Sequence, residues 1–117
     1  MTAAYDFDTV TQLAEYVLLS YDVPTHLIGF TYLKEAVAYK LVCSPRSFNV
    51  IYRFIADKHK TTQGSVMRDI SYAIEHSQKL CEFVSLPQSQ LFRSRVISNL
   101  AIHVKAASLK DVAPKVI

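Results

Sequence analysis

The side chains best suited to chemistry in this chain are basic or hydroxyl-bearing, and they gather between residues 58 and 72. A Lys-His-Lys-Thr-Thr run at 58–62 precedes a segment whose polar residues recur at helical spacing, opposite an apolar stripe. Ammonium, guanidinium and hydroxyl groups arranged in this way are the donors that bind phosphates and base edges. The sequence therefore predicts contacts with double-stranded DNA from Lys58, Lys60, Thr61, Thr62, Ser65, Arg68, Ser71 and Tyr72.

Other chemistry finds no support in the sequence. Cys43 and Cys81 stand alone in apolar surroundings, so we expect small buried hydrophobes rather than nucleophiles or zinc ligands. Gly29 and Gly64 are isolated, and neither lies in a phosphate-binding glycine loop. We therefore expect no enzyme, no metal and no cofactor. Two free thiols and the lack of a signal peptide or a membrane-length apolar run favour a cytoplasmic protein with no membrane partner.

Length and charge favour a single domain with an uneven charge distribution. The chain has 117 residues, half of them hydrophobic, which is enough for one buried core. Residues 1–22 contain four acidic residues and no Lys or Arg, whereas the remainder contains all 13 basic residues and six acidic ones. A net charge of +7 behind a leading segment of −4 is compatible with a nucleic-acid partner.

Apolar residues recur at spacings of three and four almost throughout, which indicates an all-α fold. We expect a compact helical bundle of about five to six helices, with a domain spanning residues 1–107 and a flexible tail at 108–117. A helix-turn-helix is expected at about 45–83, because a short polar break separates its two helical segments. The first expected helix begins after Asp8 or Thr9 and ends before Pro24. The other expected helices cover 31–43, 45–58 with Ser44 as its cap, 62–83, and Gln88 or Ser89 to 107.

Two blocks of sequence resemble a known domain. The run Val-Pro-Thr-His-Leu-Ile-Gly-Phe-Thr-Tyr-Leu-Lys-Glu-Ala-Val at 23–37 is similar to its opening signature, and residues 51–75 resemble its second block at matching separation. The domain is the C-terminal DNA-binding effector of the master sporulation response regulator of endospore-forming bacteria, the stage 0 sporulation transcription factor. The resemblance covers roughly residues 9–84, and it implies an all-helical effector that binds short DNA boxes and regulates transcription in the cytoplasm of a bacterium.

The resemblance also shows departures from the family pattern. Of the expected recognition residues, only Arg68 is retained; Ser65 replaces an arginine, Met67 a glutamate, and Ser71 and Tyr72 an arginine and a histidine. A short helix before the last one is expected to be shortened or absent. We expect no receiver domain within 117 residues and therefore no phosphorylation-driven control. The alternative function is a protein-interaction module on the same fold that has lost specific DNA readout.

The last helix is apolar on more than one side, which is typical of a helix with a second partner surface. A homodimer contact through Leu91, Phe92, Arg95 and Leu100 is one interpretation, since the family uses its terminal helix when two copies meet on DNA. Burial of this helix in the monomer core is the other. The transcription machinery is a further expected partner.

Overall fold

Six helices make up the part of the chain that the computed structural model describes, which is residues 6–84 and 92–116 for the backbone and residues 6–82 and 93–107 for the side chains. No strand occurs among these residues, so the all-α prediction is confirmed. In chain order the helices are α1 (Phe7–Ser20), α2 (Ile28–Cys43), α3 (Phe48–His59), α4 (Gln63–Glu75), α5 (Gln78–Val84) and α6 (Phe92–Val116).

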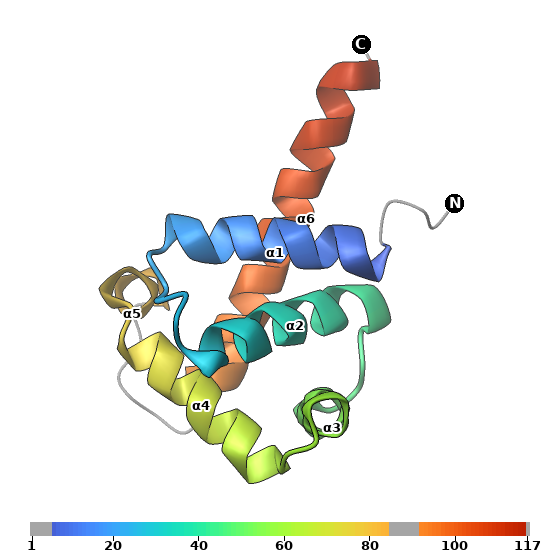
Figure 1. Ribbon diagram of the computed structural model, residues 1–117. Coiled ribbons are helices and arrows are strands. Elements are labelled where there is room, and N and C mark those ends of the chain that lie inside the picture. The colour runs from blue at the N-terminus through green and yellow to red at the C-terminus, as the bar shows by residue number, and fades with distance from the viewer. Residues whose placement is uncertain (1–5, 85–91, 117) are drawn as a thin grey trace.

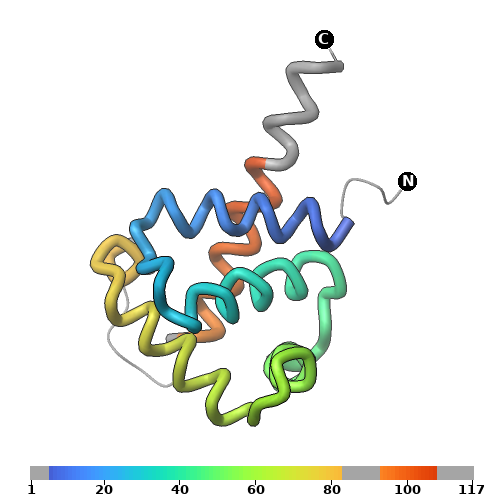
Figure 2. The backbone as a smooth tube through the Cα atoms, in the orientation of Figure 1, coloured from blue at the N-terminus to red at the C-terminus, as the bar shows by residue number. Residues whose placement is uncertain are grey.

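Helix α2 lies at the centre of the bundle. It contacts α1, α3, α4 and α6, and Figure 1 shows α1 alongside it, α3 and α4 at one end of the molecule, and α6 crossing behind. This position explains why half of its residues are buried, among them Leu33, Ala36 and Ala38, none of which is exposed to solvent. The trace in Figure 2 shows the same arrangement, with α3 and α4 joined by a short turn.

Three helix starts differ from the sequence prediction. Helix α2 begins at Ile28 rather than at residue 31, directly after the extended backbone of Leu27. Asp6, rather than Asp8 or Thr9, caps α1, and its carboxylate accepts a hydrogen bond from the Thr9 amide at 3.2 Å. Helix α3 begins at Phe48 instead of Pro45, because Ser44 adopts a left-handed conformation (φ 44°) that terminates α2. Ser47 then caps α3 by accepting from the Asn49 amide. The end of α2 also leaves Cys43 exposed, so the expectation that it is buried was wrong.

The single helix expected over 62–83 is instead two helices with a break at His76 and Ser77. The Ser77 hydroxyl donates to the Tyr21 carbonyl at 2.7 Å and accepts from the Leu80 amide at 3.2 Å. Ser77 thus caps the second helix and ties it to the segment after α1, a tertiary cause that helical spacing does not reveal. A short helix, α5, therefore does precede the last helix, with seven residues.

Helix α6 extends along most of the C-terminal part of the chain. Its expected caps, Gln88 and Ser89, lie outside the described residues, and its backbone is helical from Phe92 to Val116. The expected tail at 108–117 therefore lies on this helix as far as Val116. None of the described helices has the length and apolar character needed to cross a membrane.

Candidate nucleic-acid interface

A three-residue turn joins α3 to α4 and has a well-defined backbone. Lys60 adopts the left-handed conformation (φ 55°) that ends α3, and its amide donates to the carbonyls of Ala56 and Asp57. The Thr61 amide donates to the Ala56 carbonyl at 2.9 Å. Thr62 caps α4, because its hydroxyl accepts from the Ser65 amide at 3.1 Å. These contacts fix where α4 begins and leave Lys60 and Thr62 exposed beside its N-terminus.

Helix α4 has one buried and one exposed face. Val66, Ile70, Ala73 and Ile74 have no measurable exposure and pack into the core. The exposed stripe recurs every three or four residues and consists of Gly64, Arg68, Tyr72 and Glu75. The structure therefore places Arg68 and Tyr72 on the exposed face of α4.

Arg68 is oriented by its own helix. Its Nη2 donates to the Ser65 hydroxyl at 3.1 Å, one turn towards the N-terminus of α4. Within residues 6–82 and 93–107, no carboxylate lies within ion-pair distance of Arg68 or of Lys60. Their charges are therefore available to an external anion.

Ser71 and Tyr72 differ in orientation although they are neighbours. The Ser71 hydroxyl is half-buried and accepts from Nη1 of Arg93 on α6 at 2.9 Å, so it faces the bundle rather than the outer stripe. Tyr72 is half exposed, and its ring lies 4.0 Å from the His76 ring, centroid to centroid, at a tilt of 35°. Of these two predicted contacts, only Tyr72 lies on the exposed face.

Arg93 connects three helices. Besides Ser71 on α4, its guanidinium lies 5.9 Å from the ring centroid of Tyr52 on α3. Burial raises the pKa of the Tyr52 hydroxyl, and the hydrogen bond and charge of Arg93 only partly oppose this effect, so the phenol stays neutral at physiological pH. No sequence pattern predicts this contact, because Tyr52, Ser71 and Arg93 are 19 to 41 residues apart along the chain. Arg93 thereby braces α4 against α3 and α6.

A buried carboxylate holds the last turn of α3. Glu35 on α2 is 6% exposed; its Oε2 accepts from Lys58 Nζ at 2.9 Å, and its Oε1 lies 2.8 Å from Nε2 of His59. The His59 ring also packs edge-on against Tyr32, with centroids 5.1 Å apart. Lys58, predicted as a phosphate contact, is thus paired within the protein. The Glu35 site was missed from the sequence, where its signal is an acidic residue among apolar neighbours.

Close packing also fixes the position of α4 against α2. A Cβ atom added at Gly29 would overlap the backbone carbonyl of Asp69 and lie 2.9 Å from the Ala73 Cβ. Only a glycine allows the two helix backbones to approach so closely. Gly29 in the first turn of α2 therefore determines how far α4 stands from the core.

Of the residues predicted for a dimer contact, the structure describes the side chains of Arg95 and Leu100, and these two differ in exposure. Leu91 and the side chain of Phe92 lie outside the described residues, whereas Arg95 is exposed. Leu100 has no exposure and packs in the core together with Val96 and Val104. Burial follows because α6 crosses both α1 and α2, so Leu100 belongs to the monomer core.

Comparison with known proteins agrees with this geometry. The family model described as "Sporulation initiation factor Spo0A C terminal" matches residues 14–101, which extend from α1 into α6. No curated protein and no solved structure matches the chain. The family consists of DNA-binding effector domains of a transcription factor. The match covers about three-quarters of the sequence and includes the whole α3–turn–α4 unit, and the chain therefore belongs to the family of the C-terminal domain of the sporulation initiation factor Spo0A.

Proposed function

We propose that this domain regulates transcription by binding double-stranded DNA sequence-selectively, with the N-terminal half of α4 in the major groove. Family membership supports DNA binding and transcription regulation. The observation that carries the finer proposal is the exposed stripe of α4, where Arg68 stands without a carboxylate partner among the described residues. Arginine in this position can donate two hydrogen bonds to the edge of a guanine.

Each remaining exposed group takes a role from its position. Ser65 orients the Arg68 guanidinium, which lowers the conformational cost of base contact. Lys60, Thr61 and Thr62 bind phosphate together with the N-terminal amides of α4, whose helix dipole favours an anion. Tyr72 contacts a phosphate or a sugar. Lys58 and Ser71 act indirectly, because Glu35 and Arg93 engage their side chains.

The test is a selection of binding sites from a random duplex pool, followed by titrations at about 50 and 200 mM salt. The wild type should select a common short box. Arg68→Ala should relax the selection at one base pair by about 1–3 kcal/mol, while Lys60→Ala should weaken all sequences alike and flatten the salt dependence. Lys79→Ala is the matched control, because Lys79 lies on α5, pairs with Asp22 in the turn after α1, and should leave both readouts unchanged when replaced.

Two results would refute the proposal. One is a wild type that enriches no sequence. The other is an Arg68→Ala protein that selects the same box with the same preference at every position. Either result would favour the alternative function, a protein-interaction module on this fold.

A further inference from the structure

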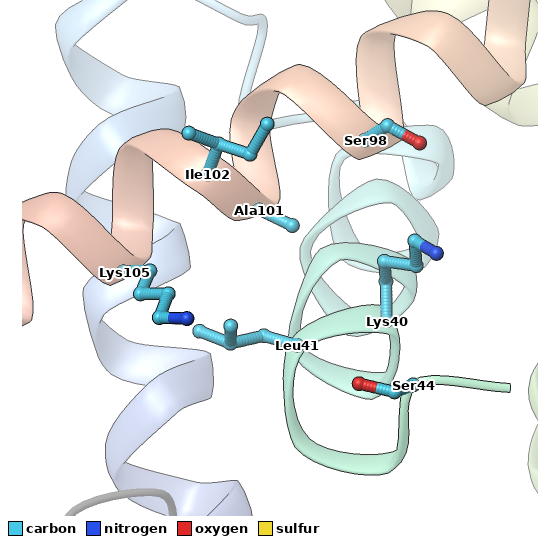
Figure 3. A pocket seen from close by; sticks show the side chains of 7 residues that line it. All are labelled: Lys40, Leu41, Ser44, Ser98, Ala101, Ile102 and Lys105. Atoms are coloured by element: carbon cyan, nitrogen blue, oxygen red, sulfur yellow. The ribbon is translucent and has the colours of Figure 1, made fainter.

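A second surface of the domain has the character of a binding groove. It lies between the C-terminal end of α2 and the middle of α6 and has a volume of about 360 Å³. Figure 3 shows its lining from both helices: Lys40, Leu41 and Ser44 from the α2 side, and Ser98, Ala101, Ile102 and Lys105 from α6. Helix α4 contributes no residue, so this groove is separate from the candidate DNA interface.

The floor of the groove is apolar. Ala101 is buried and Leu41 is half-buried, whereas Ile102 is 66% exposed. Leu100 and Val104 are buried in the core, whereas Ile102 is exposed on another face of α6. Core packing therefore does not explain why this position carries an isoleucine. Covering an aliphatic side chain of this size is favourable for any partner that brings its own apolar group.

The rim of the groove is basic. Lys40 and Lys105 flank it from opposite helices, and Figure 3 shows each side chain extending from its own helix. A neighbouring depression of about 400 Å³ shares Ser98 and Ile102 and adds Arg95. None of the residues lining either depression is acidic. Lys40 and Lys105 thus line the same groove as Ile102, with the Lys40 ammonium also 5.4 Å from the Phe48 ring centroid, and Arg95 lines the depression beside it.

We propose that this α2–α6 groove binds an acidic segment of a partner protein, with an apolar side chain of that segment packed on Ile102. Carboxylates of the segment complement Lys40, Lys105 and Arg95, while its apolar anchor removes Ile102 from water. A nucleic-acid backbone would satisfy the cations but would leave the isoleucine without an apolar partner. This proposal does not rest on DNA readout by α4.

The test measures the fluorescence anisotropy of a short labelled peptide in which Leu recurs at helical spacing and Glu occupies the other positions, so that the peptide can form an amphipathic helix. The wild-type protein should bind it at one site. Ile102→Gln should weaken binding about tenfold or more, which corresponds to about 1.4 kcal/mol, and Lys105→Gln should weaken it and reduce its salt dependence. Tyr16→Gln is the matched control, since Tyr16 is 75% exposed on α1 outside the groove and should leave peptide binding unchanged.

Further arms identify a wrong occupant. A peptide with Ser in place of every Leu should bind far more weakly, because it lacks the anchor. Equal binding by wild type and Ile102→Gln would overturn the proposal, and so would displacement of the peptide by a short DNA duplex. Self-association that sedimentation detects without peptide, and that Ile102→Gln abolishes, would assign the groove to a second copy of the chain and also overturn it. Circular dichroism of each variant establishes that its fold is retained.

Discussion

The crossing of α2 and α4 gives a sharp prediction from the only two glycines in the chain. Gly29 and Gly64 both occupy the second position of a helix, α2 and α4 respectively, and neither has a positive φ. Replacing either with alanine therefore changes helix propensity by a similar amount. The difference between the two variants reports packing alone.

The packing around the two positions is very different. An alanine Cβ at position 29 meets the backbone carbonyl of Asp69, with the carbonyl carbon at 2.8 Å, and the Cβ of Ala73. These atoms cannot rotate away, so α2 and α4 must separate. At position 64 the nearest atom is the Thr62 hydroxyl at 4.0 Å, which leaves room for the methyl group.

Overpacking of a core typically costs about 1–3 kcal/mol, and a backbone clash belongs at the upper end of that range. We expect Gly29→Ala to lower the free energy of unfolding by about 2–3 kcal/mol, which for a domain of this size lowers Tm by about 10 °C. Gly64→Ala should instead raise the free energy of unfolding by about 0.5 kcal/mol, because alanine restricts the unfolded chain more than glycine does. Urea and thermal denaturation, followed by circular dichroism, measure both changes.

Equal stability of the two variants would refute the close α2–α4 crossing. DNA binding provides a second readout of the same pair. Gly29→Ala displaces α4 and should weaken binding to every DNA sequence. Gly64→Ala adds a methyl group on the exposed stripe, and it should change DNA affinity only through direct contact of that methyl group with the DNA. A Gly29→Ala protein that keeps full stability and full DNA affinity would contradict the positioning role assigned to this residue.

Two further predictions concern the two helix ends that flank the α3–α4 turn, the last turn of α3 and the first turn of α4. Glu35→Ala should lower the free energy of unfolding, measured by urea denaturation, by about 1–3 kcal/mol, because Lys58 and His59 lose a buried acceptor. The control Glu15→Ala removes a long surface ion pair and should change this free energy by less than about 0.5 kcal/mol. Equal losses in the two variants would contradict the role of burial. Thr62→Ala should lower the free energy of unfolding by about 1 kcal/mol, because it removes the cap of α4, whereas Thr62→Ser keeps the cap and should retain wild-type stability. An alanine variant of unchanged stability would show that the cap does not hold the turn.

Periodicity predicted much of the fold because α1, α3 and α4 each have a local signal for one apolar face. The buried residues Val66, Ile70, Ala73 and Ile74 of α4 are those that the 3.6-residue stripe indicates. The helix expected over 62–83 also ran through Ser77, and here periodicity misled, because the helix breaks at His76 and Ser77, and the Ser77 hydroxyl caps the next helix and donates to the Tyr21 carbonyl. A break made by a partner 56 residues away leaves no periodic signal.

The candidate site divides in the same way. Arg68 and Tyr72 lie on the exposed face that helical spacing predicts. Lys58 and Ser71 have the right residue types and positions for phosphate contact, yet their partners come from α2 and α6. Residue type and spacing identify which groups are able to bind DNA, but only the tertiary fold decides which of them another helix has already engaged.

This division has a consequence for how the domain acts on DNA. Under the proposed function, engagement of Lys58 by Glu35 removes a cation from the phosphate-binding set, while the hydrogen bond to Ser65 orients Arg68 for base contact. Non-specific affinity depends mainly on the number of phosphates neutralised, whereas base contacts carry specificity. Specific and non-specific binding share the phosphate contacts, so an interface with few of them loses both kinds of affinity alike and keeps the ratio of the two. In the proposed mode of binding, a partner protein held in the α2–α6 groove and bound to neighbouring DNA would offset that loss through a higher effective concentration.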